Sequence, residues 1–271
     1  MEAAYQQRAK KRFGQHFLHD KGVIERMLRM LNPQSSDRVV EIGPGSGALT
    51  FPLLERLPQL DIIEIDRDVI AWWQNQAQAD KLRIHAQDAL SINLAQLRGN
   101  SPSLRIVGNL PYNISTPLLF HLLAQVEHLQ DMLFMLQKDV VDRITATADN
   151  KDYGRLSVML QYFCETTYVM KVGPGAFQPS PKVDSAVVYL RPWQTAPHPA
   201  AHNLSDFSKL VAQAFSQRRK TLRNTLKGLL HAEHIEQSGI NPNQRAETLS
   251  VSDFVNLANL WTELQCATTQ A

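Results

Sequence analysis

Cysteine is scarce in this chain: two cysteines occur among 271 residues. Cys164 and Cys266 lie far apart, and neither has a second Cys or a His at the spacing of a metal site. A structural zinc site needs four such ligands at characteristic spacings, and a disulfide framework needs several cysteines. We therefore expect neither a disulfide nor a bound metal ion, and we expect a reducing, cytoplasmic location.

Long hydrophobic runs are also missing. No apolar run approaches the ~18 to 20 residues that span a bilayer as a helix. The first 15 residues, MEAAYQQRAKKRFGQ, lack the apolar region of a secretory signal. We therefore expect no membrane partner.

A strong net charge of one sign is absent as well, because 28 Lys and Arg stand against 26 Asp and Glu. Overall charge does not indicate a nucleic-acid-binding protein, but its distribution does. Residues 205–231 contain six basic residues and one acid, Asp206. A second basic cluster lies in the N-terminal arm, at Arg8, Lys10, Lys11 and Arg12. Two such clusters are typical of a polyanion-binding surface, although a solvated basic helix face gives the same pattern.

Apolar, β-branched runs alternate with helical stretches through the first two thirds of the chain. The runs predict strands at 39–42, 61–65, 82–86, 104–108 and 132–137. Between them, the stretches 69–79 and 117–126 have helical patterns. Strands that alternate with helices predict an α/β fold, with a parallel sheet covered by helices on both faces.

The last third of the chain changes character. Its predicted elements are a helix at 155–163 and strands at 166–172 and 185–192, before a linker at 193–203. After the linker the pattern is helical to the end. We therefore predict one domain over residues 1–195 and a second, all-helical domain over 196–271.

A glycine-rich segment, EIGPGSGALT at 41–50, contains the end of the first predicted strand and the loop after it. Gly43, Gly45 and Gly47 allow a tight turn and a close approach of the backbone to a ligand. The spacing is Gly-x-Gly-x-Gly and not the Gly-x-Gly-x-x-Gly of dinucleotide sites. Glu41 would repel a pyrophosphate, so the segment favours a ligand with positive charge, such as an amine or a sulfonium.

Polar side chains follow the next three strands where each strand ends. Glu64 and Asp66 end the second strand, Asp88 follows the third, and Asn109 ends the fourth. The carboxyl ends of parallel strands meet at one rim of the sheet, where ligands bind. We expect Glu64, with Asp66 as the alternative, to accept from two ribose hydroxyls, and Asp88 to accept from an adenine amino group. The competing interpretation is that these acids cap the helices that follow.

The stretch GNLPYNIST at 108–116 contains no Cys, His or acid. Its Asn109 oxygen and the Leu110 carbonyl could accept both N–H hydrogens of an adenine amine, which would favour attack by that weak nucleophile. Pro111 restricts Leu110 to an extended conformation, and Tyr112 offers a face for stacking. Asn and Pro also favour plain turns, so the stretch alone leaves both interpretations open.

A second aromatic partner for the base is expected on energetic grounds. Extracting a base from its stack costs a few kcal/mol, whereas one aromatic contact returns ~1–3 kcal/mol. One Tyr would therefore only compensate this cost. Phe177, in the Pro-rich segment AFQPSPK, is the candidate for the second stacking contact.

Eight ordered segments resemble the ribosomal RNA adenine N6,N6-dimethyltransferase family, in particular its small-subunit branch, over nearly the whole chain. They are RFGQHFL (12–18), EIGPGSGALT (41–50), EID (64–66), QDAL (87–90), GNLPYNIST (108–116), YGRLSV (153–158), FQPSPKVDSAVV (177–188) and AFSQRRKTLRNTL (214–226). The resemblance implies a class I S-adenosylmethionine-dependent methyltransferase fold, with a seven-stranded, mostly parallel sheet whose last strand is antiparallel. A small helical C-terminal domain would bind RNA.

The resemblance also implies an activity and a partner. S-adenosylmethionine would supply four methyl groups, two to each of two adjacent adenines in the loop of the 3′-terminal helix of 16S rRNA. The reaction would occur late in assembly of the small ribosomal subunit, and the enzyme would be a monomer.

Site residues follow from the matching motif positions. The predicted cofactor contacts are His16, Leu18, Gly43, Gly45, Glu64, Asp88, Ala89 and Asn109. The residues predicted to meet the target adenine are Asn109, Leu110, Pro111, Tyr112 and Phe177. The predicted RNA contacts are Arg218, Arg219, Lys220, Arg223 and the N-terminal arm. Relatives often have Asn in place of His16; because histidine can carry a charge near neutral pH, we hypothesise that cofactor affinity depends on pH here.

Two other functions compete with this interpretation. One is a methyltransferase that modifies a single adenine of large-subunit rRNA; the segments YGRLSV and RRKTLRN favour the small-subunit branch instead. The other is an assembly factor whose binding to the ribosomal particle outweighs catalysis. The intact glycine loop, strand-end acids and NLPY stretch indicate that activity is retained.

Overall fold

The computed structural model describes residues 16–270. These residues form two compact units. The first contains the chain up to Val141 together with Thr167–Pro192, and the second contains Asp142–Thr166 together with the chain from Trp193 onward. Both units are therefore built from two separate stretches of sequence.

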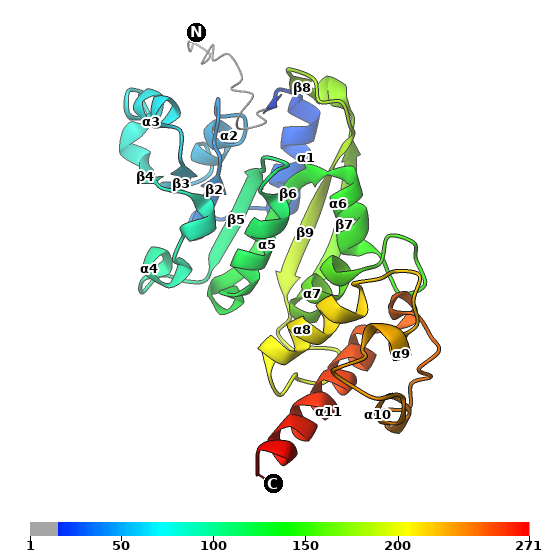
Figure 1. Ribbon diagram of the computed structural model, residues 1–271. Helices are drawn as coiled ribbons and strands as arrows, with labels where there is room; N and C mark the ends of the chain where they lie inside the picture. The colour runs from blue at the N-terminus through cyan, green and yellow to red at the C-terminus, as the bar shows by residue number, and fades with distance from the viewer. Residues whose placement is uncertain (1–15, 271) are drawn as a thin grey trace. The chain divides into compact units, whose positions relative to one another are not determined.

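A seven-stranded sheet forms the centre of the first unit (Figure 1). In spatial order its strands are β4 (Leu82–Ala86), β3 (Leu60–Glu64), β2 (Val39–Ile42), β5 (Leu104–Asn109), β6 (Leu129–Gln137), β9 (Ser185–Pro192) and β7 (Cys164–Val172). The strands from β4 to β6 pair in parallel, whereas β9 runs antiparallel to β6. The predicted α/β class and the antiparallel last strand are confirmed.

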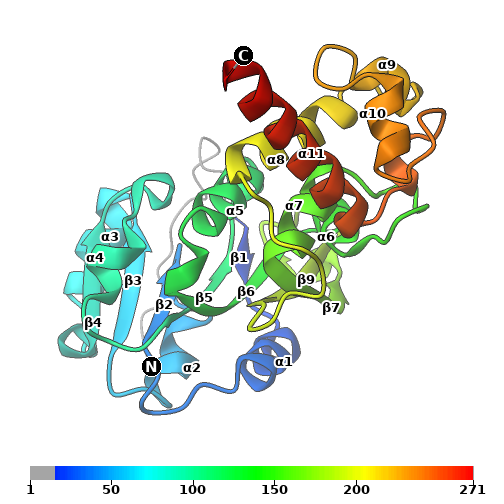
Figure 2. The same ribbon diagram turned by 90° about the horizontal axis from the view of Figure 1, so that it is seen from below.

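Helices cover both faces of this sheet. Figures 1 and 2 place α1 (Lys21–Leu31) and α2 (Thr50–Leu54) on one face and α5 (Ser115–Leu123) on the other. The remaining helices along this part of the chain are α3 (Arg67–Gln74), α4 (Leu94–Arg98) and α6 (Lys138–Thr145). Because both faces are covered, the central strands are mostly buried, and all four residues of β2 are buried.

Element ends differ from the sequence prediction by a few residues. The helix expected at 69–79 is α3, which begins two residues earlier because the side chain of Asp66 accepts from the N–H of Asp68 and caps it. It ends at Gln74, and a short 3-10 turn covers Ala79–Lys81 instead. The strand β6 begins three residues before its predicted start, at Leu129.

β2 and β5 are parallel neighbours in the sheet, and the direction in which successive strands are added changes between them. Chain order runs outward from β2 to β4 on one side and from β5 to β6 on the other, so a crevice opens between their carboxyl ends. Gly108 permits this close pairing, because a Cβ at that position would lie 2.6 Å from the Ile42 carbonyl oxygen. The glycine loop and the NLPY stretch therefore leave the sheet side by side.

A separate pair of two-residue strands brings distant segments together. β1 (Phe17–Leu18) pairs antiparallel with β8 (Phe177–Gln178), so that Leu18 lies opposite Phe177. The N–H of His19 extends the pairing by donating to the Ala176 carbonyl. The segment before α1 is thus fixed to the segment before β9.

The second unit is mainly helical. Its helices are α7 (Arg155–Phe163), α8 (Leu204–Ala214), α9 (Leu222–Thr225), α10 (Ala232–Gln237) and α11 (Val251–Gln270). Phe207 and Leu210 of α8 and Phe254 and Leu257 of α11 are fully buried and form its core. Within residues 16–270, no helix has the length and apolar character needed to cross a bilayer.

Candidate active site

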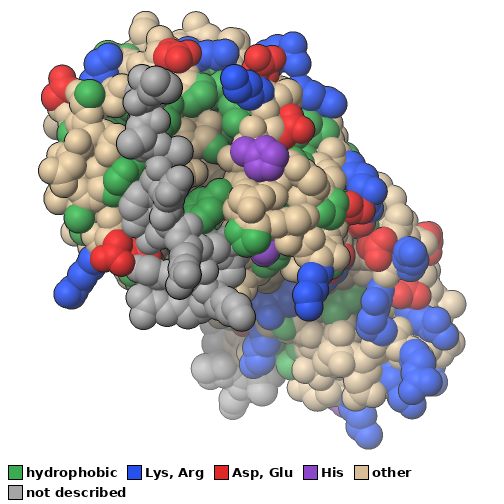
Figure 3. Space-filling view, turned by 90° about the horizontal axis from the view of Figure 1, so that it is seen from above, with side chains coloured by type: hydrophobic (Ala, Val, Ile, Leu, Met, Phe, Trp, Pro, Cys, Tyr) green, Lys and Arg blue, Asp and Glu red, His purple; other side chains and the backbone are tan. Residues whose placement is uncertain are grey.

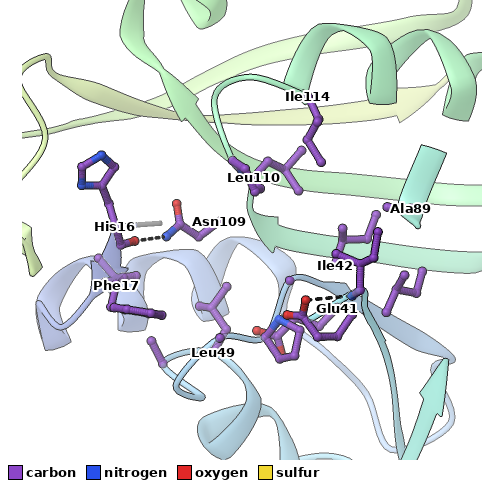
Figure 4. Close-up of a pocket in the computed structure, with 18 of the residues that line it drawn as sticks. His16, Phe17, Glu41, Ile42, Leu49, Ala89, Asn109, Leu110 and Ile114 are labelled. Atoms are coloured by element: carbon purple, nitrogen blue, oxygen red, sulfur yellow. Dashed lines mark hydrogen bonds between the residues drawn. The ribbon is translucent and has the colours of Figure 1, made fainter. Parts of the chain in front are cut away.

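A cavity of about 340 Å³ lies at the carboxyl ends of the parallel strands (Figure 4). Its walls come from β1 and from the loops that follow β2, β3, β4 and β5. The structure brings together here all but one of the residues predicted to contact the cofactor or target base: His16, Leu18, Gly43, Gly45, Glu64, Asp88, Ala89, Asn109, Leu110, Pro111 and Tyr112. Phe177 is the exception.

Each of the three glycines in the loop after β2 is required for a different structural reason. Gly43 has φ +70°, and a Cβ there would meet no atom within 4 Å, so its role is conformational. A Cβ on Gly45 would lie 3.3 Å from the ring of Phe17. Gly47 does not line the cavity; a Cβ there would lie 2.5 Å from the ring of Phe51. The expectation that Gly47 approaches a ligand is therefore wrong. The absence of a side chain at Gly47 leaves room for the ring of Phe51.

Glu41 places a carboxyl group in the cavity wall. It is 2% exposed, and its Oε2 accepts a 2.7 Å hydrogen bond from the Thr50 hydroxyl. Burial raises the pKa of Glu41 to about 8; the Thr50 bond opposes this rise, and the charge of Glu64 adds to it. The sequence led us to expect a negative charge here, but with a pKa of about 8 Glu41 is largely protonated near pH 7, because the fold buries it.

The strand-end acids divide between ligand-facing and capping positions. Glu64 lines the cavity, and its Oε1 accepts from the next two backbone N–H groups at 2.8 Å each. Asp66 caps α3 and does not line the cavity, so Glu64 is the acid at the position expected for the ribose contact. Asp88 does both, because it lines the cavity while its Oδ1 accepts from the N–H of Leu90.

Asn109 has a fixed orientation at the end of β5. Its Nδ2 donates a 2.9 Å hydrogen bond to the backbone carbonyl of His16, drawn as a dashed line in Figure 4. A carbonyl oxygen only accepts, so this bond identifies which end of the amide is nitrogen. The N–H of Leu110 donates to the Met135 carbonyl at 3.1 Å, which ties the next residue to β6. Because the bond to His16 engages the Nδ2 of Asn109, the Oδ1 of Asn109 is the atom that can accept from a ligand.

Tyr112 is held by a residue that the sequence analysis did not single out. Its hydroxyl lies 2.8 Å from the Oγ of Ser185, a fully buried side chain at the start of β9. Burial raises the pKa of Tyr112, and the bond to Ser185 opposes that rise. The phenol is therefore neutral near pH 7 and is available for stacking rather than as a base. Ser185 does lie inside the segment 177–188 that carries the family resemblance.

Phe177 stands apart from the other predicted contacts. Its side chain is 2% exposed, packs in the hydrophobic core, and does not line the cavity. Stacking on a base would require the ring to turn out of this position. Phe17, which the sequence analysis did not name, lines the cavity instead. The only indication in the sequence was that Phe17 lies between His16 and Leu18, which are both predicted cofactor contacts.

The four basic residues of the second unit that are predicted to contact RNA are exposed. Arg218, Arg219, Lys220 and Arg223 lie between α8 and the end of α9, and the Arg218 guanidinium donates to the carbonyl of Lys151. Figure 3 shows Lys and Arg side chains gathered at the lower right of the face that it displays. The predicted N-terminal arm contacts lie outside the described residues.

Among residues 16–270, no group of three or more His, Cys, Asp and Glu side chains is arranged to hold a metal ion. Cys164 is buried, and burial raises the pKa of its thiol to about 12. This thiol is therefore uncharged near neutral pH, and it is a poor nucleophile.

Curated relatives match the chain over most of its length. Ribosomal RNA small subunit methyltransferase A of Alcanivorax borkumensis is 53% identical over 253 residues, which cover 93% of this chain and 90% of the relative. The protein of the same name from Pseudomonas aeruginosa is 51% identical over 265 residues, which cover 97% of this chain and 98% of the relative. The similarity therefore includes both compact units.

Solved structures agree in fold. The crystal structure of a dimethyladenosine transferase from Plasmodium falciparum has a TM-score of 0.74 and 26% identity, and the match covers 89% of this chain and 96% of that one. The 23S rRNA methyltransferase ErmE has a TM-score of 0.69 at 22% identity, with 91% and 99% covered, a likeness that concerns the fold. A sequence model of the family described as "Ribosomal RNA adenine dimethylase" matches residues 6–263. The cavity brings strand-end acids and the NLPY stretch together, and the family model and the curated relatives cover most of the chain. This chain therefore belongs to the ribosomal RNA adenine dimethylase family.

Proposed function

We propose that the protein transfers methyl groups from S-adenosylmethionine to the N6 amines of two adjacent adenines in the loop of the 3′-terminal helix of 16S rRNA. The observation that carries the proposal is the position of Asn109, Leu110 and Tyr112 at the wall of a cavity that also contains Glu41 and Glu64. Relatives more than half identical to the chain are small-subunit methyltransferases by name, which supports the choice of substrate.

The cavity fits a cationic adenosyl cofactor. Among the described residues that line it there is no Lys or Arg, whereas Glu41, Glu64 and Asp88 supply three carboxyl groups. Ile42 and Ile65 provide apolar surface. Near pH 7 Glu41 is largely protonated, because its pKa is raised to about 8, so the negative charge that repels phosphate and attracts an ammonium or sulfonium group comes from the other two acids. When bound, S-adenosylmethionine supplies an electrophilic methyl group.

The protein's contribution to the reaction is to orient the amine. The Oδ1 of Asn109 and the carbonyl of Leu110 would accept the two N–H hydrogens of the target adenine, which leaves the nitrogen lone pair directed at the methyl group. Tyr112 would stack on the base. Since its phenol is neutral near pH 7, Tyr112 does not act as the base, and the proton would leave to water after the nitrogen has been alkylated.

The partner we infer is the small ribosomal subunit, with residues 1–195 as the catalytic domain and 196–271 as the RNA-binding domain of a monomeric, cytoplasmic protein. Arg218, Arg219, Lys220 and Arg223 are exposed and available for phosphate contacts. Each lost phosphate contact lowers the salt dependence of binding by about one unit of slope. Replacing all four by Ala should therefore lower the slope by up to about four.

The matched control for this prediction changes the same amount of charge elsewhere. Four exposed basic residues of the first unit, replaced together by Ala, should leave the slope near its original value: Arg26, Arg29, Arg56 and Lys81. Binding of each variant to small subunits is measured by filter binding between 50 and 300 mM KCl. Equal slopes for the two fourfold variants would place the RNA footprint outside the segment from the end of α8 to the end of α9.

The direct test is methyl transfer from labelled S-adenosylmethionine to small subunits that lack the modification, with naked rRNA, large subunits and duplex DNA beside them. Digestion and mass analysis should find N6,N6-dimethyladenosine from the small subunits. Product formed on large subunits instead would move the assignment to the other rRNA branch. Cofactor binding without any product would favour an assembly factor.

A further inference from the structure

The segment His16–His19, here named the N-terminal strap, is attached to the rest of the first unit at three points. Its β1 strand pairs with β8, and the N–H of His19 donates to the Ala176 carbonyl at 2.9 Å. The third attachment is a side chain: His16 Nδ1 lies 2.8 Å from the Pro179 carbonyl oxygen. Because a carbonyl oxygen only accepts, Nδ1 carries the proton in this bond.

His16 contacts both groups expected to handle the target base. Its backbone carbonyl accepts the 2.9 Å bond from Asn109 Nδ2. Its imidazole ring is stacked with the ring of Tyr112, with 5.7 Å between centroids and 29° between planes. The Tyr112 hydroxyl is held by Ser185. One residue of the strap thus reaches the amide and the aromatic ring together.

The orientation of the Asn109 amide has a chemical consequence. If the amide were rotated by half a turn, its N–H groups would face the N–H groups of the adenine amine, and neither could accept. The bond to the His16 carbonyl opposes that rotation, because Asn109 Oδ1 would then face another oxygen. The acceptor is therefore set before the base arrives.

We propose that His16 is a positioning residue for methyl transfer: its ring, anchored on Pro179 and stacked on Tyr112, holds the backbone of His16 in place, so that its carbonyl fixes the Asn109 amide with Oδ1 toward the target amine. This inference rests on the proposed function and gives His16 a role distinct from holding the cofactor. The two roles differ in the kinetic constant that they change.

The two ring contacts can be separated by substitution. H16N keeps an amide N–H close to the position of Nδ1 but removes the ring; H16F keeps a ring but has no donor; H16A removes both. The matched control is H19A, which removes the exposed imidazole three residues along the same segment. The protein is full length throughout, and circular dichroism and thermal unfolding verify that each variant is folded.

Two quantities are measured for each variant: the dissociation constant of S-adenosylmethionine by calorimetry, and the single-turnover rate of methyl transfer to unmodified small subunits at saturating cofactor. Positioning predicts that H16A slows the single turnover about tenfold, which corresponds to about 1.4 kcal/mol, while the dissociation constant changes less than threefold. H16N and H16F should each recover part of the rate, and H19A should match the parent. A weakened cofactor affinity with an unchanged single-turnover rate would overturn the proposal.

A spectroscopic measurement tests the same contact without catalysis. In ¹⁵N-labelled protein the side-chain amide resonances of Asn109, assigned by their loss in N109D, report the bond to the His16 carbonyl. H16A keeps the backbone carbonyl but loses the ring that anchors it, so these resonances should move in H16A, and they should stay in place in H19A. Unmoved Asn109 resonances in H16A would refute the positioning role. If the resonances move in H16A as expected but the parent protein methylates no subunit, the proposed function alone is refuted.

Discussion

The two walls of the cavity are built in different ways. In the wall formed at the carboxyl ends of β2 and β3, each of the two glutamates bonds a partner nearby in the chain. Glu41 accepts from Thr50, nine residues on, and Glu64 accepts from the N–H groups of the two residues that follow it. This wall is largely specified by short stretches of local sequence.

The wall formed by the NLPY stretch depends on remote partners. Asn109 bonds His16, 93 residues away, and Tyr112 bonds Ser185, 73 residues away. His16 bonds Pro179, 163 residues away. Orienting a weak nucleophile needs groups fixed against several elements, whereas a bound cofactor can adapt to a loop. Changes at remote partners should therefore affect methyl transfer before they affect cofactor binding.

Among substitutions that distinguish the two walls, one at Asn109 is expected to have the largest effect on methyl transfer. N109A removes one of the two acceptors for the target amine and should lower single-turnover methyl transfer by about 10² to 10³, the range found for removing one fixed hydrogen-bonding group at a reacting centre. Affinity for S-adenosylmethionine should change far less, as calorimetry would measure. If cofactor affinity fell in proportion to the rate, Asn109 would belong to the cofactor wall.

Substitutions in the glycine loop separate packing from conformation. G47A forces a Cβ to within 2.5 Å of the Phe51 ring at φ +92°, so it should lower the free energy of unfolding by about 3 kcal/mol. G43A is the matched control, since φ is +70° but no atom lies within 4 Å, and about 1 kcal/mol of strain is expected. Urea unfolding measures both. Equal losses would show that packing against Phe51 contributes nothing.

Titration of Glu41, in the cofactor wall, makes the free energy of unfolding depend on pH. With its pKa raised from 4.5 to about 8 in the folded protein, Glu41 keeps a proton that the unfolded chain loses. The associated stability is fully present below about pH 4.5 and is lost as pH rises through about 8. E41Q has no such group, so its stability relative to the parent should rise by about 2 kcal/mol or more between pH 5 and 8.

Chemical unfolding at intervals across this pH range measures the difference between E41Q and the parent. Above about pH 8 the difference should level off, because Glu41 is then ionised in both states. A difference that stays constant from pH 5 to 8 would show that the carboxyl group titrates normally.

The smallest effect is expected at the bond between Tyr112 and Ser185. Y112F keeps the stacking ring and loses the hydroxyl, and S185A loses the other partner; each should slow methyl transfer about five- to tenfold, in line with ~1 kcal/mol for a hydrogen bond. Because both remove the same bond, the double variant should be about as slow as either single one. Fully additive losses would mean that the two hydroxyls act separately.

The sequence by itself determined the strands, the glycine loop and the acids at the strand ends. Hydrophobic alternation and buried runs are local patterns, and four of the predicted segments match β2, β4, α7 and β9 residue for residue. Caps and tight turns depend on neighbouring residues in the same way, which is why Asp66 could be anticipated as a possible helix cap.

Only the tertiary structure decided which side chains complete the target wall. Nothing near Asn109 in the sequence indicates that its amide is held by His16, and nothing near Phe177 indicates that its ring is buried in the core. Such contacts depend on the order of strands in the sheet and on the pairing of β1 with β8, which join segments more than a hundred residues apart in the chain. The sequence specified the chemical groups, and the fold specified their directions.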